Sequence, residues 1–427
     1  MMDESLLIPP AEVIGEFVAD TPHSRLERTS RQALCSMRFD LRWQSEHATH
    51  TDSQVSRKLN LWRDIFPPEL EVDILDRPVG HVASHDFKPG SLIEAYRAGD
   101  ALTIKPHQFN RSFQKNRLVE PRSGRFYPRG FIAGVRGIFP EERTPFRVTQ
   151  RDESLSVDLN HPLADRELRL SAAVLDIRQA GDEHGGACHD IAELATLAGP
   201  GMQGRWRGEA TDFWSDNPFA RLSEEPDAYF YQMPRLVDHL DSAAGGQIVA
   251  LYDRLIPPGG EVLDLMSSWN SHLPEQLELS SVSGLGMNRE ELDANPRLDH
   301  RLVHDLNLQP VLPYEDNRFD AMLCTVSVEY LLKPVAIFKE AYRVLKPGGR
   351  LIITFSNRWF QPKVINIWQD LHEFERMGLV LEYFLSAGGY RSLETWSLRG
   401  LPRPEQDKYA GRLLFADPLY AVWGEKA

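Results

Sequence analysis

The chain has 427 residues, 42% of them hydrophobic and 26% charged, and its formal net charge is −14. It is too long for one typical hydrophobic core, so two or three domains of ordinary soluble composition are expected. The negative charge argues against nucleic acid and anionic membranes as partners, and no apolar run reaches the roughly 18 residues of a membrane span. The acidic start shows no secretory signal and three cysteines give no disulfide framework, so we expect a cytoplasmic protein.

The first 180 residues predict short strands separated by turns. Arg38 to Trp43 alternates between polar and apolar residues, as a half-buried strand does. No long amphipathic helix is expected before about residue 185, and regularly spaced short strands are typical of a β-rich domain. The other strands expected here lie at residues 70–75, 101–104, 130–135 and 145–149.

One stretch of this region carries a distinctive motif. Residues 155–164 read LSVDLNHPLA, a strand followed by a tight turn, and residues 168–177 form a second alternating strand. The motif resembles the ending VDxNHxLAG of bacterial FKBP-type prolyl isomerases of the SlyD class, with Asp165 in place of the usual glycine. The resemblance implies an FKBP-like fold, and it leaves two roles open: prolyl isomerisation, or a platform for a substrate or partner.

A glycine-rich, polar stretch follows residue 180 and predicts a linker. His184, Cys188 and His189 have side chains that bind transition metals. Their spacing matches no standard zinc pattern, however, and a polar linker with incidental histidines is the commoner case. No metal site is therefore assigned.

The second half of the chain alternates helices and strands, which is typical of an α/β domain with a parallel sheet. Residues 229–255 predict two helices, and in the first of them Tyr231, Arg235 and His239 recur every four residues and share one face. That face is either a solvated polar surface or a lid over a ligand.

The strand expected at residues 262–266 is apolar except for Asp264. Parallel sheets bind ligands at the carboxyl ends of their strands, and a buried carboxylate is costly unless a partner satisfies it. Asp264 is therefore a candidate binding residue. The following residues, up to Ser271, lack the glycines of a dinucleotide-binding loop. This argues against NAD and FAD and leaves room for a ligand without phosphates.

More strands and helices complete the alternation. Asn288 is expected to begin a short helix, and Pro347-Gly348-Gly349 to end a longer one. Polar residues after the fourth and fifth strands, Glu329, Tyr330, Asn357 and Arg358, are expected to face the same crevice as Asp264. The remaining strands are expected at residues 281–287, 298–303, 319–326, 351–355, 390–398 and 418–423, with mostly helix over 364–384.

Two long strings in this half match one known pattern. Residues 312–320 read LPYEDNRFD and residues 338–349 read FKEAYRVLKPGG. They resemble the LPF…FD…E..RVLKPGG signature of class I S-adenosylmethionine-dependent methyltransferases, over about residues 226–427. The resemblance implies a Rossmann-like α/β domain with a seven-stranded, mostly parallel sheet, and S-adenosylmethionine as cofactor. The cofactor contacts that it implies are Asp264, Met266, Ser267, Ser268, Asn288, Asp305, Leu306 and Thr325.

The sequence departs from that family at two places. Serines and an asparagine replace the loop glycines within residues 267–271, and Gly286 stands where an acidic residue usually holds the ribose hydroxyls. A lost charged hydrogen bond is worth roughly 1.5–3 kcal/mol. The expected compensation is that the serines bind the cofactor's carboxylate and that Asn288 binds the ribose. The stretch also resembles a methyltransferase-like group with DLMSSW.SHLP here, which implies that the serine loop is a family form.

These patterns predict a methyltransferase acting on a small molecule, with a small thiol or sulfide as one candidate, because a deprotonated sulfur needs no base. Two alternatives stay open. One is a folding or metal-handling factor with a degenerate methyltransferase-like module, and the other is a protein methyltransferase. The catalytic candidates are Tyr231, Arg235, His239, Asn357 and Arg358. The expected divisions are an extension (1–60), the FKBP-like domain (61–180), a linker (181–225) and the methyltransferase domain (226–427).

Overall fold

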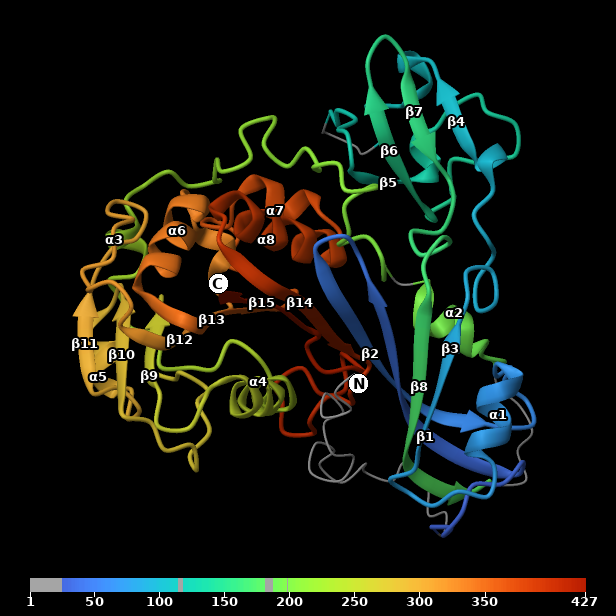
Figure 1. Ribbon diagram of the computed structural model, residues 1–427, viewed down its shortest axis with the longest axis horizontal. Coiled ribbons are helices and arrows are strands. Elements are labelled where there is room, and N and C mark those ends of the chain that lie inside the picture. Colours follow the sequence, from blue (N-terminus) through green and yellow to red (C-terminus); the bar gives the residue numbers. More distant parts are fainter. Residues whose placement is uncertain (1–24, 114–117, 181–186, 198) are drawn as a thin grey trace.

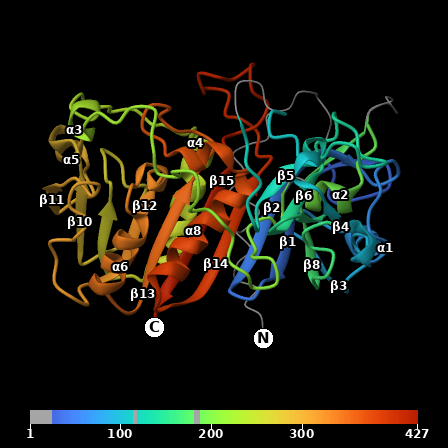
Figure 2. The same cartoon turned by 90° about the horizontal axis from the view of Figure 1, so that it is seen from above.

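The computed structural model describes residues 25–113, 118–180, 187–197 and 199–427. Within these residues, strands from both halves of the chain form one eleven-stranded sheet, in the order β11-β10-β9-β12-β13-β15-β14-β2-β1-β8-β3 (Figure 1). The expected seven-stranded sheet is therefore one part of a larger sheet. The two parts meet where β2 and β14 pair in parallel, and Figure 2 shows these strands side by side.

The strands of the second half follow the expected α/β alternation. The first five run parallel to their neighbours, while β15 is antiparallel to both β13 and β14. Apolar runs form the central strands because both faces of the sheet are covered by helices. The strands are β9 (Glu261–Leu265), β10 (Ser281–Gly286), β11 (His300–Val303), β12 (Phe319–Thr325), β13 (Leu345–Phe355), β14 (Tyr390–Arg399) and β15 (Leu419–Lys426).

Helices cover the two faces of this part of the sheet (Figure 1). One hydrophobic cluster joins α4 and α5 to one face, and another joins α6, α7 and α8 to the opposite face. None of the helices in the described ranges combines the length and the apolarity that crossing a bilayer requires. The helices are α3 (Asp227–Phe230), α4 (Ser242–Leu255), α5 (Arg289–Ala294), α6 (Pro334–Val344), α7 (Asn366–Asp370) and α8 (Glu373–Ala387).

The first half contributes four strands to the large sheet and carries a smaller, separate sheet. The chain leaves β3, forms the small sheet in the order β4-β7-β6-β5 and returns through β8. Each sheet has its own hydrophobic core. The elements are β1 (Ala33–Gln44), β2 (Ala48–Asn60), α1 (Pro68–Ile74), β3 (Val82–Phe87), β4 (Ala101–Ile104), β5 (Phe126–Pro128), β6 (Pro145–Arg151), β7 (Leu155–Asp158), β8 (Leu168–Gln179) and α2 (Ile191–Thr196).

Three expectations for the first half were wrong. Residues 70–75 lie mainly in helix α1 rather than in a strand, because Leu70 and Ile74 are one helical turn apart and both are buried. The strand expected at 130–135 is a single 3₁₀ turn followed by one isolated bridge. Strand β1 is buried on both faces rather than half-buried, and it pairs with β8. Residues 33–60 therefore lie inside the sheet rather than in an extension, although the domain boundaries themselves stay predictions.

Two expectations for the second half were also wrong. The helix expected before α4 stops after Phe230, and the chain then bends as far as Asp241. Pro234 lies within that stretch, where its ring would interrupt a helix. The Pro-Gly-Gly sequence that was expected to end a helix lies inside β13, because α6 already ends at Val344.

Candidate active site

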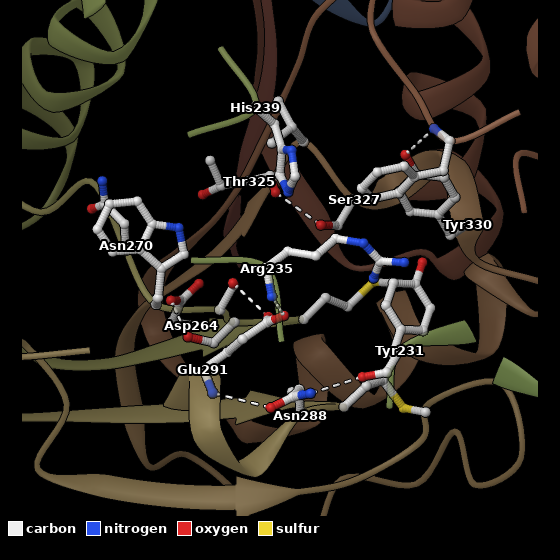
Figure 3. Close-up of a pocket in the computed structure, with 18 of the residues that line it drawn as sticks. Tyr231, Arg235, His239, Asp264, Asn270, Asn288, Glu291, Thr325, Ser327 and Tyr330 are labelled. Atoms are coloured by element: carbon white, nitrogen blue, oxygen red, sulfur yellow. Dashed lines mark hydrogen bonds between the residues drawn. The ribbon is translucent and has the colours of Figure 1, made fainter. Parts of the chain in front are cut away.

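A cleft opens at the carboxyl ends of β9, β10, β11 and β12 (Figure 3). It holds about 1160 Å³, part of which is open to solvent, and residues 227–240 form one of its walls. Of the expected catalytic residues, Tyr231, Arg235 and His239 line it. All of the expected cofactor-binding residues line it as well: Asp264, Met266, Ser267, Ser268, Asn288, Asp305, Leu306 and Thr325.

The serine loop after β9 is folded around the buried carboxylate of Asp264. The hydroxyls of Ser267 and Ser271 both donate to Asp264 Oδ2, each at 2.6 Å. Burial raises the pKa of Asp264 to about 6, while the two hydroxyls act in the opposite direction. The backbone adopts left-handed conformations at both ends of the loop, at Met266 (φ 55°) and His272 (φ 53°). The serines therefore have a structural part in holding a loop that lacks glycine.

Gly286 at the end of β10 lies directly beneath this loop. The Ser267 backbone N–H donates to Leu285 O at 2.8 Å, and a Cβ at Gly286 would overlap the carbonyl oxygen of Ser267. An acidic side chain does not fit at this position while the loop follows its present course.

Asn288, the expected ribose ligand, is already engaged on both sides of its amide. Its Oδ1 accepts from the backbone N–H groups of Glu290 and Glu291 and so caps helix α5. Its Nδ2 donates to the carbonyls of Tyr231 and Gln232 at 2.9 and 3.2 Å. Asn288 therefore fixes the start of α5 to the segment that walls the cleft.

Glu291 lines the cleft but was not among the expected site residues. Its Oε2 accepts a hydrogen bond from Ser268 Oγ and its Oε1 accepts one from the Arg235 backbone N–H, each at 2.7 Å (Figure 3). The spacing Asn288-x-x-Glu291 reads as a capping box, in which the glutamate would turn back to the helix start. In the structure, the Glu291 carboxylate points into the cleft instead.

Residues 231–240, which follow α3 and form no helix, bring Tyr231, Arg235 and His239 to the cleft. The Arg235 guanidinium lies 4.6 Å from the ring centre of Phe230 and 5.1 Å from that of Phe360. Burial raises the pKa of Tyr231 and lowers the pKa of His239. Both side chains are therefore neutral near pH 7.

Asp227 anchors the start of this segment. Its carboxylate contacts Arg221 Nη1 at 2.7 Å, Lys363 Nζ at 2.9 Å and Asn307 Nδ2 at 2.9 Å. These partners come from three separate parts of the chain, and all are buried or half-buried. One wall of the cleft is therefore held in place by a buried ion cluster.

Asn357 and Arg358 were expected in this cleft but line a second cavity of about 1300 Å³, part of which is also open to solvent. Arg358 Nε pairs there with Asp417 Oδ2 at 2.9 Å. The backbone N–H of Asp417 in turn donates to the Asp241 carboxylate, and the backbone N–H of Asp241 donates to the Asp417 carboxylate. Asp241 follows the cleft residue Leu240. The expectation was wrong: both residues line the second cavity, where Arg358 is paired with Asp417.

One other expected position, Glu329, also lies outside the cleft. Tyr330 lines the cleft, but Glu329 is buried and does not.

Of the possible metal ligands in the linker, Cys188 is exposed and His184 lies outside the described residues. Among the described residues, no group of three or more His, Cys, Asp or Glu side chains is placed to hold a metal ion.

Several known proteins similar to this chain are methyltransferases. Residues 272–353 match a family model described as a methyltransferase domain. The chain is 30% identical over 159 residues to the ubiquinone/menaquinone biosynthesis C-methyltransferase UbiE of Cronobacter sakazakii, covering 36% of this chain and 56% of that protein. It is 30% identical over 66 residues to malonyl-[acyl-carrier protein] O-methyltransferase of Marinomonas sp., covering 16% of this chain and 24% of that protein.

Two solved structures match part of the chain with low TM-scores. An S-adenosylmethionine dependent methyltransferase from Mesorhizobium loti matches at 16% identity and a TM-score of 0.28, over 41% of this chain and 96% of that one. A SAM dependent methyltransferase from Aquifex aeolicus matches at 16% identity and a TM-score of 0.29, over 44% and 91%. The chain spans less than two thirds of either curated relative. The methyltransferase match lies in its second half, at residues 272–353.

Proposed function

We propose that this protein is an S-adenosylmethionine-dependent methyltransferase that acts on a small molecule. The observation that carries the proposal is the position of the cleft. It lies at the carboxyl ends of β9 to β12, where parallel α/β sheets bind ligands, and the methyltransferase match at residues 272–353 spans β10 to β12.

The residues of the cleft fit the chemistry of this cofactor. S-adenosylmethionine carries a sulfonium cation, an amino acid group and a nucleoside with two hydroxyls. The cleft contains more carboxylates than cations, which favours a positively charged ligand. Its Arg235 is suited to a carboxylate. The acidic residues that line the cleft are Asp227, Asp238, Asp264, Glu291 and Asp305.

The cofactor supplies an activated methyl group, and the residues of the cleft position the acceptor and exclude water. His239 is neutral and can accept a proton from a hydroxyl or amine acceptor, while Tyr231 stays protonated and can donate a hydrogen bond. A small thiol or sulfide acceptor would need neither. The narrower form of the proposal is that the acceptor is a small thiol or sulfide.

Titration calorimetry of the full chain with S-adenosylmethionine tests the function. Binding tighter than millimolar is expected, and Asp264→Asn should weaken it at least tenfold because the loop loses its charged anchor. Since the cofactor is a cation and burial raises the pKa of Asp264 to about 6, affinity should rise between pH 5 and 7 in the wild type but not in the variant. Asp86→Asn, an exposed control, should change nothing. Absence of wild-type binding would exclude the enzyme.

The N-terminal half supports a platform role rather than isomerisation. Asn160 of the NHP motif forms two hydrogen bonds with the backbone of Arg97, and so joins the chain entering the small sheet to the chain leaving it. His161 Nε2 contacts Thr196 O at 3.2 Å. These side chains are used by the fold itself, in keeping with the proposed FKBP-like domain. A proline-peptide assay on the full chain should therefore show no rate above background; acceleration would restore the isomerase.

A further inference from the structure

We propose that Glu291 is the carboxylate that binds the vicinal hydroxyls of the cofactor's ribose, in place of the side chain that Gly286 lacks. This inference rests on the proposed function and assigns one residue to one part of the ligand. It follows from the course of the serine loop, the commitments of the neighbouring polar groups and the position of Glu291 itself.

The first step is that no side chain can extend from the end of β10. The carbonyl of Ser267 occupies the space that a Cβ at position 286 would need, and the Ser267 N–H is bonded to the same strand at Leu285. Gly286 and Glu291 nevertheless line the same cleft. The Glu291 carboxylate, from the first turn of α5, thus reaches the cleft, whereas position 286 at the end of β10 cannot place a side chain there.

The second step is that the other polar groups nearby already form hydrogen bonds within the protein. The amide of Asn288 caps α5 and holds two carbonyls of the wall. Asp264 is only 2% exposed, and its Oδ2 already accepts from two serines. Asp305 follows a different strand, β11, where its Oδ1 accepts from two N–H groups of its own loop. Of the carboxylates near the end of β10, Glu291 is the one suited to a diol.

The third step is that Glu291 has the capacity to bind a diol. A carboxylate offers about four lone-pair positions on its two oxygens. Ser268 Oγ uses one on Oε2 and the Arg235 N–H uses one on Oε1. Two adjacent hydroxyls can donate to the remaining positions, and hydrogen bonds to a charged acceptor are about twice as strong as neutral ones.

A consequence of this arrangement is that the diol would be tied to both walls of the cleft. Ser268 belongs to the loop after β9, whereas Arg235 belongs to segment 227–240. Both walls form hydrogen bonds to the carboxylate that would bind the ribose. Ribose binding by Glu291 would therefore also position segment 227–240, whose residues face the acceptor.

Calorimetry with two probes tests the assignment: S-adenosylhomocysteine, and its 2′,3′-dideoxy analogue, which lacks the diol. The wild type should bind the first at least tenfold more tightly. Glu291→Gln keeps the shape but removes the charge, so it should weaken S-adenosylhomocysteine at least tenfold and change the analogue less than threefold. The matched control is Glu290→Gln, on the exposed neighbour in α5, which should leave both affinities unchanged.

The outcomes separate this inference from the function on which it rests. If the wild type binds neither probe, the methyltransferase proposal fails. If it binds both equally, or if Glu291→Gln weakens both to the same extent, the diol contact is excluded while the cofactor site stands. The comparison of the two probes on the wild type requires no variant. Equal binding of both would therefore still overturn the assignment if Glu291→Gln fails to fold.

Discussion

Glu329 is a buried acidic residue whose charge the fold does not satisfy. It is 1% exposed, and its Oε2 has no hydrogen-bond partner among the described residues. Burial raises its pKa to about 8, although Arg376 acts in the opposite direction. It follows β12 and precedes Tyr330 of the cleft wall. At neutral pH this carboxyl is therefore largely protonated.

Glu329→Gln should make stability less dependent on pH. The folded pKa of about 8 lies above the ordinary 4.5, so protonation favours the folded state. The stabilisation is complete below pH 4.5 and is lost as pH rises through about 8. The wild type should therefore lose about 5 kcal/mol of unfolding free energy relative to the variant over that window. Urea unfolding at pH 5 and 8.5 should capture about 4 kcal/mol of this loss; a difference independent of pH would contradict it.

At the level of single residues, the sequence predicted those whose environment is set locally. Asp264 stands out because it interrupts an apolar strand, and its burial follows from that strand. Glu291 was missed because the sequence assigned it only to the short helix that Asn288 begins. Its contacts with Ser268 and Arg235 depend on two loops that meet only in the folded chain.

The serine loop and β10 act as one packed element. Gly286→Ala would force a methyl group into the Ser267 carbonyl, and overpacking of this kind costs typically 1–3 kcal/mol. We expect a loss of about 2 kcal/mol in thermal unfolding, together with weaker cofactor binding. The matched control is Gly246→Ala in α4, which meets open space and should stabilise by about 0.5–1 kcal/mol. If both substitutions changed the stability equally, the serine loop would have to move aside to make room for the methyl group at position 286.

The sequence predicted the buried strands of the second half but not the cleft wall. Strands β9, β12 and β13 are apolar runs, and such runs have few other structures available to them. Segment 231–240 has apolar residues at helical spacing, namely Met233, Leu236, Val237 and Leu240, yet the first three are more than half exposed and Leu240 alone of the four is buried. Most of the stripe has no core to pack against, so tertiary contacts of the segment override its periodicity.

At the scale of the whole molecule, the pairing of β2 with β14 joins the two halves. Asp52 of β2 accepts from Ser397 Oγ and Arg399 Nη2, both at 2.6 Å, and its side chain is fully buried. His50 Nδ1 contacts Thr395 Oγ1 at 2.8 Å. The sequence could not predict this joint, because these partners lie about 345 residues apart and parallel pairing leaves no turn between them.

Asp52→Ala should destabilise both halves together. It leaves the largely buried Arg399 without its partner, and breaking a buried ion pair in this way costs about 3–5 kcal/mol. Scanning calorimetry should show a single transition at lower temperature. Asp86→Ala removes an exposed partner of Arg169 and should change stability by less than about 1 kcal/mol. Two separate transitions would contradict a shared cooperative unit.

The joined sheet also determines which strand edges stay unpaired. Among the described residues it ends at β11, a strand of four residues, and at β3, a strand of six. Without β2, the ten residues of β14 would form an open edge, and long open edges are templates for aggregation. The N-terminal half therefore protects its partner from edge-to-edge association, and a fragment of the second half alone should aggregate.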